Sequence, residues 1–451
     1  MIDENIFKLE SGESLTLFEK TLIGQIRQVC DSFPKPTIAR IVGGWVRDKI
    51  LGKENDDIDI AIEGCDCRAF TEKYNETFPI TKIAIIEPNP GMSKHLTIAR
   101  ICINNEFWLD VCSLRPDDFT NPDSNSIGTP LSDARRRDFT INALFFNVNL
   151  CKVEDFVGGI DDLKNGIIRT PIDPNITLSD DPLRAIRSFR FAIKFSFKID
   201  QSILDYIPSL KKAIAENVTK DRLSQELLKM MKGDNIIKAL DLMIQTKVFS
   251  SVFSPPSSLD EITFLEQAKV AISRCNNTEF YFTLILALIY KDFYNANDVQ
   301  DPDKPRKKIS QIEVSITRNL KLSMNYTKDV TTLLKSAQII SKLPRPLTRL
   351  TVGKWVREIG DLWVYTGCLI FDEEDVKFYQ EQVLPFVHKE NLTEIIHMKP
   401  LLNGKQLADL HGLKKLGPQV ADLLNQLVEW QIMNPNKKAS DYIEFIKSSR
   451  K

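Results

Sequence analysis

Strand-forming sequence is confined to the first part of this chain, and this constrains the fold more than any other feature. Six β-rich runs with partial alternation fall within the first 150 residues, together with two helical stretches at 14–33 and 67–78. The six runs are IARIVGG, DDIDIAI, TKIAIIE, HLTIARICI, FWLDVCSL and INALFFNVN. Strand signals fade after Lys164, and most later segments have helical spacing, namely 180–195, 218–232, 263–273, 279–292, 326–341 and 419–433. The sequence therefore predicts an α+β fold, with a mixed-sheet head followed by an all-helical remainder.

The balance of charges and the spacing of the cysteines limit the classes of protein to which this chain could belong. The 60 basic residues balance 61 acidic ones, so any nucleic-acid surface must be a local patch. Eight scattered cysteines and four histidines show no zinc spacing, which favours reduced thiols in an intracellular protein. The longest apolar stretch, 282–289, is far shorter than the ~20 residues of a membrane span. We expect a cytoplasmic protein, with the nucleus and mitochondria as further compartments, and no membrane partner.

The segment IVGGWVRDKILGKENDDIDIAI, residues 41–62, carries the strongest chemical signal. Gly43 and Gly44 end a strand and let backbone N–H groups approach a phosphate, which Arg47 could also reach. In the next strand Asp57 and Asp59 point to one face, opposite the isoleucines. Two carboxylates beside a phosphate-binding turn suit Mg²⁺ ions for phosphoryl transfer. Each piece alone has a plainer interpretation, a simple turn or a solvated acidic face.

A third acid, Asp110, interrupts the apolar run FWLDVCSL. It is a candidate member of the same metal site. The alternative is a charge that blocks pairing at an edge strand.

The segment DARRRDFTINAL, residues 133–144, places three arginines in a row. Since three consecutive side chains cannot all face one way, Arg136 and Arg137 are the candidates to bind a triphosphate bidentately. Asp138 and Asn142 could bond ribose hydroxyls or hold the arginines. The alternative is a solvated basic turn before a strand.

The segment SDDPLRAIRSFRFAIKFSF, residues 179–197, repeats polar residues every three positions, which predicts one helix side made of Asp181, Arg184, Arg187 and Arg190. An acid and an arginine one turn apart can read a base edge. The carboxylate accepts from the exocyclic amino group that cytosine and adenine share. The alternative is that Asp181, directly before Pro182, is only a helix N-cap.

These motifs, in this order, resemble the tRNA nucleotidyltransferase family, the CCA-adding enzymes of the polymerase-β superfamily, in its class II, eukaryotic type. GGWVRD and DIDIAI resemble the metal and triphosphate motif, RRDFTINAL the ribose motif, EDFVGGIDDL the connecting motif and DDPLRAIRSFRF the amino-acid template. Further marks are NPGMSKHLTIA (89–99), KPLLNGKQL (399–407) and LGPQVADLLNQLVEWQIMNP (416–435).

The resemblance implies four parts: a nucleotidyltransferase head (1–165), a base-selecting neck (166–254), a helical body (255–390) and a tRNA-binding tail (391–451). It implies Mg²⁺-dependent addition of CMP and AMP, from CTP and ATP, to the tRNA 3′ end. Carried over by residue, Asp57 and Asp59 hold the metal, Asp110 is a possible third acid, and Gly44, Arg47 and Arg137 meet triphosphate and sugar. Asp181 and Arg184 select the base, with Arg187 and Arg190 in support.

Three departures from the family pattern bear on which nucleotides are added. The segment between Arg115 and Arg135 holds no basic residue, the connecting motif is Val-Gly-Gly, and the neck reads TKDRLSQELLKMM. They raise the hypothesis of a CC-only or A-only enzyme that works with a second nucleotidyltransferase. A poly(A) polymerase of the same superfamily and an inactive tRNA-binding protein are also compatible with a head of this kind.

Positive charge collects in the second half of the chain, where we expect the tRNA surface. One patch is KPRKK at 304–308, and another is the five basic residues in 434–451. Gly417-Pro418 could open a helix whose N-terminus meets a phosphate. The alternative for each is solvated surface charge.

Overall fold

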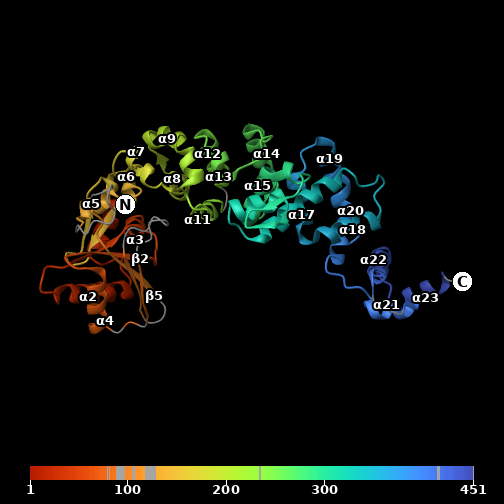
Figure 1. Ribbon diagram of the computed structural model, residues 1–451, viewed down its shortest axis with the longest axis horizontal. Coiled ribbons are helices and arrows are strands. Elements are labelled where there is room, and N and C mark those ends of the chain that lie inside the picture. The colour runs from red at the N-terminus through yellow and green to blue at the C-terminus, as the bar shows by residue number, and fades with distance from the viewer. Residues whose placement is uncertain are drawn as a thin grey trace. The chain divides into compact units, whose positions relative to one another are not determined.

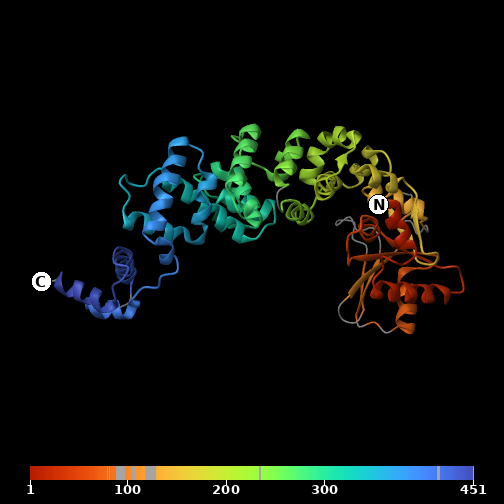
Figure 2. The same cartoon turned by 180° about the vertical axis from the view of Figure 1, so that it is seen from behind.

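The computed structural model describes residues 1–78, 80, 82–87, 97–103, 107–116, 128–232, 235–413 and 417–449. The chain divides into two compact units, 1–230 with 238–252, and 231–237 with 253–451. Figures 1 and 2 show from opposite sides that the strands of the large sheet all belong to the N-terminal part of the chain. The predicted order, an α+β head before a helical remainder, is confirmed.

Seven strands of the first unit form one sheet in the order β3-β4-β5-β2-β1-β6-β7. Strands β2 and β5 are parallel and the other neighbours are antiparallel, so the sheet is mixed as predicted. The strands are β1 Ile38–Val42, β2 Ile58–Glu63, β3 Lys82–Ile86, β4 Ile98–Ile103, β5 Phe107–Ser113, β6 Leu144–Asn147 and β7 Lys152–Asp155. Each of the six β-rich runs contains one strand.

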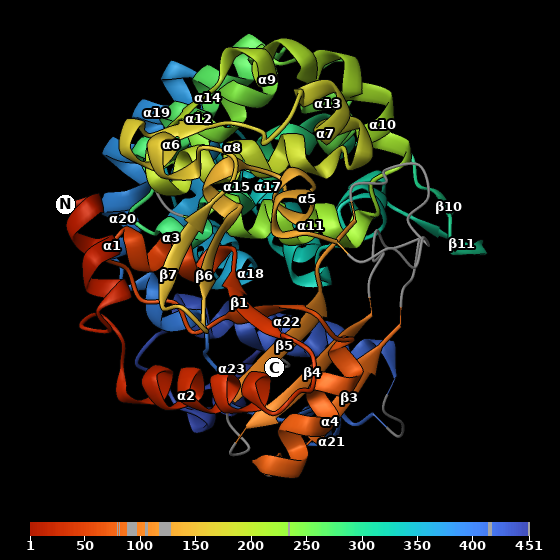
Figure 3. The same ribbon diagram turned by 90° about the vertical axis from the view of Figure 1, so that its left-hand side faces the viewer.

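One face of this sheet is apolar and covered by helices. Ile41, Ile60, Leu109 and Ile101 come from four adjacent strands and are fully buried. Helix α4 (Cys67–Thr77) packs on β4 and β5, and α2 (Leu17–Asp31) packs on β1 (Figure 3). Since strand residues alternate between faces, the opposite face carries the polar members of the same strands.

Further helices complete the first unit. Helix α8 contacts α11, and this pair positions several candidate site residues. The helices are α1 Ile2–Glu10, α3 Gly44–Ile50, α5 Pro130–Arg135, α6 Gly159–Asn165, α7 Pro174–Asp180, α8 Leu183–Phe195, α9 Gln201–Tyr206, α10 Lys211–Glu216, α11 Lys220–Met230, α12 Ile236–Gln245 and α13 Phe249–Phe253. A two-residue ladder joins β8 (Ile167–Ile168) to β9 (Lys198–Ile199).

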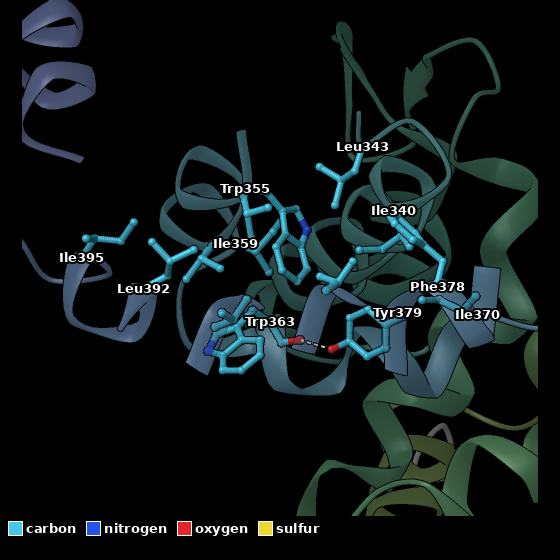
Figure 4. Packing of buried hydrophobic residues seen from close by; sticks show 14 of the residues in the cluster. Ile340, Leu343, Trp355, Ile359, Trp363, Ile370, Phe378, Tyr379, Leu392 and Ile395 are labelled. Atoms are coloured by element: carbon cyan, nitrogen blue, oxygen red, sulfur yellow. Dashed lines mark hydrogen bonds between the residues drawn. The ribbon is translucent and has the colours of Figure 1, made fainter. Parts of the chain in front are cut away.

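The second unit is built on helices around an aromatic core. Trp355 and Trp363 lie edge to face, and the Tyr379 hydroxyl donates to the Trp363 carbonyl at 3.2 Å (Figure 4). The helices are α14 Glu261–Ser273, α15 Tyr281–Tyr290, α16 Gln311–Glu313, α17 Met324–Ile340, α18 Arg349–Ile359, α19 Glu373–Phe378, α20 Leu384–Lys389, α21 Gly404–His411, α22 Pro418–Met433 and α23 Ala439–Ser448. A second small core, with Leu407, Leu427 and Tyr442, joins α21, α22 and α23.

The prediction of an all-helical remainder needs one correction besides the β8–β9 ladder. The charged loop at 301–308 is an antiparallel hairpin of β10 (Val299–Asp301) and β11 (Lys304–Ile309). The buried Asp301 carboxylate, which accepts from Arg318 at 2.8 Å, fixes the hairpin against the following helical segment. Because that partner lies outside the hairpin, the local sequence did not reveal it.

None of the helices in the described part of the chain combines the length and apolar character needed to cross a bilayer. All eight cysteines are free.

Candidate active site

Two aspartates stand at the start of β2 on the polar face of the sheet. Ile58, Ile60 and Ile62 are buried against the helices, so alternation directs Asp59, and Asp57 just before the strand, to the opposite face. Asp59 lies in register with Asp110 of the parallel neighbour β5. The predicted acid pair and the candidate third acid are therefore brought together on one face.

The Asp59 carboxyl has an unusual electrostatic environment. Burial, with the negative charges of Asp57 and Asp110, raises its pKa to about 6, against the opposing charges of Arg137 and Arg100. Ionisation of this group is costly unless more positive charge is supplied. The environment is therefore the one expected of a cation-binding carboxylate.

Asp110 is held by a neighbouring strand. The Arg100 guanidinium donates to both Asp110 oxygens at 2.6 and 2.7 Å, across the register pair that joins β4 to β5. Strand β5 pairs with β4 on one side and β2 on the other, so the edge-strand interpretation of Asp110 is wrong. Its charge is instead part of the acidic cluster.

The donor set available for a metal is small. Among the described residues no three His, Cys, Asp or Glu side chains are arranged to hold an ion together. The Asp57 and Asp59 carboxylates offer oxygen ligands on one face. Mg²⁺ is usually held by one or two carboxylates plus substrate phosphates and water, so this donor set fits that ion.

The glycine turn borders the acid pair at the end of β1. Gly43 has φ of +75°, and its N–H donates to the Leu144 carbonyl at 3.2 Å. A Cβ at this position would lie 3.2 Å from Nη1 of Arg137, so glycine leaves room for the guanidinium. A Cβ on Gly44 would meet Nδ2 of Asn55 at 3.4 Å. Both glycines therefore serve close packing around the turn.

Arg137 lies between this turn and the acids. Asp133 accepts from its Nε at 2.9 Å and from its Nη2 at 2.8 Å, which fixes the guanidinium. Its charge lowers the pKa of Asp59, so it is within electrostatic reach of the acid pair. An arginine fixed beside a candidate metal-binding acid is well placed for a phosphate.

Arg47 lies beside the glycine turn, with its Nη2 3.6 Å from where a Cβ on Gly44 would be, but its guanidinium is also engaged within the fold. Its side chain is buried, bonds Asp48 at 2.7 Å, donates to the Asn142 side chain and stacks on Phe195. Its guanidinium therefore joins α3 to the RRDFTIN segment and to α8.

The three consecutive arginines diverge as predicted. Arg135 is exposed, whereas Arg136 is buried and donates to the Pro116 carbonyl at 3.4 Å. The interpretation as a solvated turn is therefore wrong for Arg136. Its backbone carbonyl also accepts from Arg184 at 2.9 Å, so it connects the head to α8.

Asp138 and Asn142 hold arginines, which was one of their two predicted roles. Asp138 accepts from Nη2 of Arg187 at 2.7 Å and from Nδ2 of Asn142 at 3.0 Å. Burial opposes ionisation of Asp138, but the Arg187 charge, together with the hydrogen bonds from Asn142 and Arg187, outweighs it and holds the pKa of Asp138 well below its usual range. The Asp138 carboxylate is therefore a fixed anion under the α8 arginines.

The candidate base reader is less regular than the spacing predicted. Asp181 is extended, with φ of −145°, and lies between α7 and α8 rather than on a helix side. Its carboxylate accepts from Leu183 N at 3.3 Å, which is a capping contact, and from both Arg222 Nη atoms at 3.2 and 2.6 Å. Arg184 donates to the Thr177 carbonyl at 3.0 Å. Asp181 is thus held by the Arg222 side chain, whereas Arg184 is held by a backbone carbonyl.

Arg187 and Arg190 are held from α11 by an acid that the sequence interpretation missed. Glu226 accepts from Nη1 of Arg187 at 3.0 Å and also bonds Arg190. Arg222 and Glu226 stand four residues apart, one helical turn, so both face α8. That spacing within DRLSQELL was the available signal.

Comparisons with known proteins show which chains this one is similar to. Residues 39–169 match the family model of the poly A polymerase head domain, and 196–258 match a probable RNA and SrmB binding site of polymerase A. A tRNA nucleotidyltransferase of Schizosaccharomyces pombe, cca1, is 31% identical over 90% of both chains. A second one from that organism, cca2, is 27% identical and covers 95% of this chain and 97% of its own.

A mitochondrial CCA tRNA nucleotidyltransferase of Saccharomyces cerevisiae is 26% identical over 96% of this chain and 93% of its own. Poly(A) polymerase I of Escherichia coli is 29% identical but covers only 48% of this chain and 46% of its own. The solved structure of a CCA-adding enzyme with CTP superposes with a TM-score of 0.73 at 21% identity, covering 99% of this chain and 98% of that one.

Proposed function

The chain belongs to the tRNA nucleotidyltransferases of the polymerase-β superfamily, and from this premise we propose that Asp57 and Asp59 form its catalytic metal site. It is a nucleotidyltransferase that adds CMP, AMP or both, from CTP and ATP, to the tRNA 3′ end. The observation that carries the site assignment is the strand register, which sets Asp59 opposite Asp110 and beside the end of β1 that leads into the glycine turn. Burial and the two neighbouring acids raise the pKa of Asp59 to about 6, in agreement with this geometry.

The family uses divalent metal ions, and we infer Mg²⁺ because the ligands are two carboxylates without histidine or cysteine. When bound, Mg²⁺ supplies positive charge for the triphosphate and for the attacking 3′-hydroxyl. Asp57 and Asp59 hold it in their ionised forms. Arg137, fixed by Asp133, binds the phosphates that become pyrophosphate, while Gly43 leaves room for its guanidinium.

Base selection is assigned to Asp181 and Arg184. Their positions are fixed from two sides, Asp181 by Arg222 and Arg184 by the carbonyls of Thr177 and Arg136. Asp138, Asn142, Arg187 and Arg190 form the ionic support beneath them. The carboxylate of Asp181 accepts from the amino group shared by cytosine and adenine.

Two alternative functions have less support. Poly(A) polymerases match about half of the chain, whereas the tRNA nucleotidyltransferases match nearly all of it. An inactive tRNA-binding protein would gain nothing from a half-buried carboxylate that is costly to ionise.

A division of labour is the second candidate for the exact activity. In this version the chain adds fewer than three nucleotides and a second nucleotidyltransferase completes the same tRNA. Support comes from the absence of basic residues in the segment between Arg115 and Arg135, of which 117–127 lie outside the described residues. Two full-length relatives from one organism are consistent with such a pair.

Location is inferred from the relatives. Two of them, from Saccharomyces cerevisiae and Candida glabrata, are named as mitochondrial. We infer a location that includes mitochondria besides the expected cytoplasm, and fractionation of cells expressing the tagged chain checks it.

The test of the proposed function is incorporation of labelled CTP and ATP into a tRNA that lacks its CCA end. Asp57→Ala and Asp59→Ala should each abolish incorporation while tRNA binding persists, because a lost metal ligand removes transition-state stabilisation. Asp56→Ala is the matched control, since Asp56 is an exposed acid next to the pair. Near-normal turnover of either variant in Mg²⁺ would show that the metal assignment is wrong.

A further inference from the structure

An exposed tryptophan shares the sheet face that carries the catalytic acids. Trp108 is 44% exposed, whereas Trp45, Trp355 and Trp363 are buried in the two units. Its neighbours Leu109 and Val111 are fully buried under the helices, so Trp108 and Asp110 alternate onto the opposite, open face. A single exposed apolar side chain is ordinary on a protein surface, so it is the position of Trp108 on the face of the acid pair that makes it a candidate ligand contact.

The strand register places Trp108 beside the acid pair. Ile58 pairs with Leu109, and Asp59 pairs with Asp110, so one step back along both strands Trp108 lies next to Asp57. Adjacent strands are about 4.8 Å apart. The indole is therefore one strand away from a proposed metal ligand and two residues before Asp110.

Beyond β5 the sheet continues through β4 to its edge strand β3, and these two strands carry positively charged side chains. Cys102 of β4 pairs with Trp108, and Lys82 of β3 pairs with Cys102, so Lys82 lies in the same row. Lys82 is exposed, and Arg100 stands in the neighbouring row. This side of the acid pair thus offers one aromatic surface followed by basic groups.

The direction of the reaction assigns this side to the tRNA. In an in-line displacement the attacking oxygen and the leaving pyrophosphate lie on opposite sides of the α-phosphorus. Gly43 and Arg137, which border the phosphates, lie toward β1 and β6. The attacking 3′-hydroxyl must then approach over β5 and β4, where Trp108 stands.

We propose that Trp108 is a stacking surface for the terminal base of the tRNA acceptor end, with Lys82 along the path of the preceding phosphates. The inference rests on the proposed function of the acid pair. The terminal base changes with each added nucleotide, so a contact serving every round must be insensitive to base identity. Stacking meets this need, since every base has an aromatic face.

The test compares Trp108→Ala with Trp108→Phe in the full chain, on three tRNAs ending before CCA, after C and after CC. We expect Trp108→Ala to raise KM for each accepted tRNA by between about 5- and 100-fold and by a similar factor on each, with the KM for CTP unchanged. Trp108→Phe should keep most of the affinity. Leu150→Ala is the control, since Leu150 is 67% exposed in the same unit and away from the acid pair.

Fluorescence gives a readout independent of turnover. A short RNA hairpin with an unpaired 3′ end, added without nucleotide, should quench the indole emission of the wild-type chain, and the quench should be lost in Trp108→Phe. An unaltered tRNA KM for Trp108→Ala, or an equal quench in Trp108→Phe, would overturn the proposal. So would a loss confined to one of the tRNAs that the wild-type chain extends. Loss of activity in Asp59→Ala, measured alongside, keeps failure of this proposal distinct from failure of the catalytic assignment.

Discussion

At the scale of single residues, the ionised form of Asp59 that metal binding requires is the form that lowers the stability of the fold. Its pKa is raised from 3.8 to about 6, so folding favours the protonated acid. The stability that this group contributes is complete below pH about 4 and is lost as the pH rises through about 6. At neutral pH the ionised carboxylate is therefore a cost that only a bound cation removes.

Asp59→Asn should consequently stabilise the metal-free protein at neutral pH. In EDTA at pH 7.5 we expect a gain of about 1–3 kcal/mol in the free energy of unfolding, and no gain near pH 4, where wild-type Asp59 is protonated. Thermal unfolding at the two pH values measures it. Added Mg²⁺ should raise the melting temperature of the wild-type chain but not that of the variant. A variant less stable than wild type at pH 7.5 in EDTA would contradict the electrostatic assignment.

Asp181 distinguishes base reading from helix capping. Asp181→Ala should relax discrimination between CTP and UTP by about 1–3 kcal/mol while tRNA binding is kept. If the contact with Leu183 N at 3.3 Å is all that matters, Asp181→Ser should keep selectivity and Asp181→Ala should cost about 1 kcal/mol of stability. Steady-state kinetics with each nucleotide, paired with melting temperatures, separates the two outcomes.

Arg222→Ala extends that comparison, because Arg222 holds the Asp181 carboxylate without being a candidate reader. We expect a loss of selectivity between CTP and UTP that is smaller than in Asp181→Ala, since the Asp181 carboxylate is kept but is no longer held in one orientation. Equal discrimination in the wild-type chain and in both variants would favour the cap.

At the scale of elements, the α8–α11 contact depends on one buried acid. The Glu226 side chain is only 6% exposed and holds both Arg187 and Arg190. Glu226→Gln should destabilise the first unit by about 3–5 kcal/mol, because the largely buried Arg190 guanidinium loses its counter-charge and Arg187 keeps only Asp138. Glu216→Gln is the control, since Glu216 is exposed and lies 4.0 Å from Lys212. Chemical unfolding of both variants measures the difference, and equal midpoints would refute the role of Glu226.

The local sequence pattern predicted most helices and strands, but not the side-chain contacts that join them. The alternation in DIDIAI was enough to place Asp59 opposite the isoleucines, because period-two burial is a property of the strand itself. Strand β7 was missed because it is a short, mostly polar segment at the sheet edge. The burial of Arg47 and the Arg222–Asp181 pair depend on contacts far apart in sequence. Such contacts are set by tertiary packing, which a single sequence does not display.

At the scale of the whole molecule, the tail is predicted to bind tRNA through charge. Removal of residues from 434 onward should weaken binding and flatten its salt dependence. The structure shows that truncation would also remove Tyr442, which is buried against Leu407 and Leu427. A sharper variant replaces only the lysines, Lys437, Lys438 and Lys447, with glutamine.

This triple variant should lower the magnitude of the slope of log K against log salt by up to about 0.9 for each phosphate that the tail no longer neutralises. Lys211→Gln with Lys212→Gln is the control pair, since both lysines are exposed on α10. Binding measured at several salt concentrations checks it. An unaltered slope would rule out the tail lysines as the phosphate-binding groups.

For the whole enzyme, the departures of the sequence from the family pattern bear most directly on how many nucleotides are added to the tRNA. The segment from Pro116 to Ala134 has no arginine or lysine, and residues 117–127 lie outside the described part. Its described ends are held together: Ser132 donates to the Arg115 carbonyl at 2.6 Å, and a Cβ on Gly128 would lie 2.3 Å from that oxygen. The segment is thus anchored at its base but carries no positive charge of its own.

Changing the base reader from C to A after two additions requires the reader to shift, and a basic side chain in this segment is one way to drive it. Without such a side chain, the division-of-labour hypothesis predicts that purified protein extends a tRNA lacking its CCA end by two C residues and then stalls. It should use CTP well on the two shorter tRNAs and ATP poorly on the tRNA ending in CC. The A-only alternative gives the reverse, with ATP added only to the tRNA ending in CC.

Sized products from the three tRNAs, each with CTP or ATP alone and with both, decide between the CC-only and A-only alternatives. Efficient conversion of the shortest tRNA to a full CCA end by this chain alone would end the hypothesis, because one active site would then complete all three additions without a basic residue in that segment.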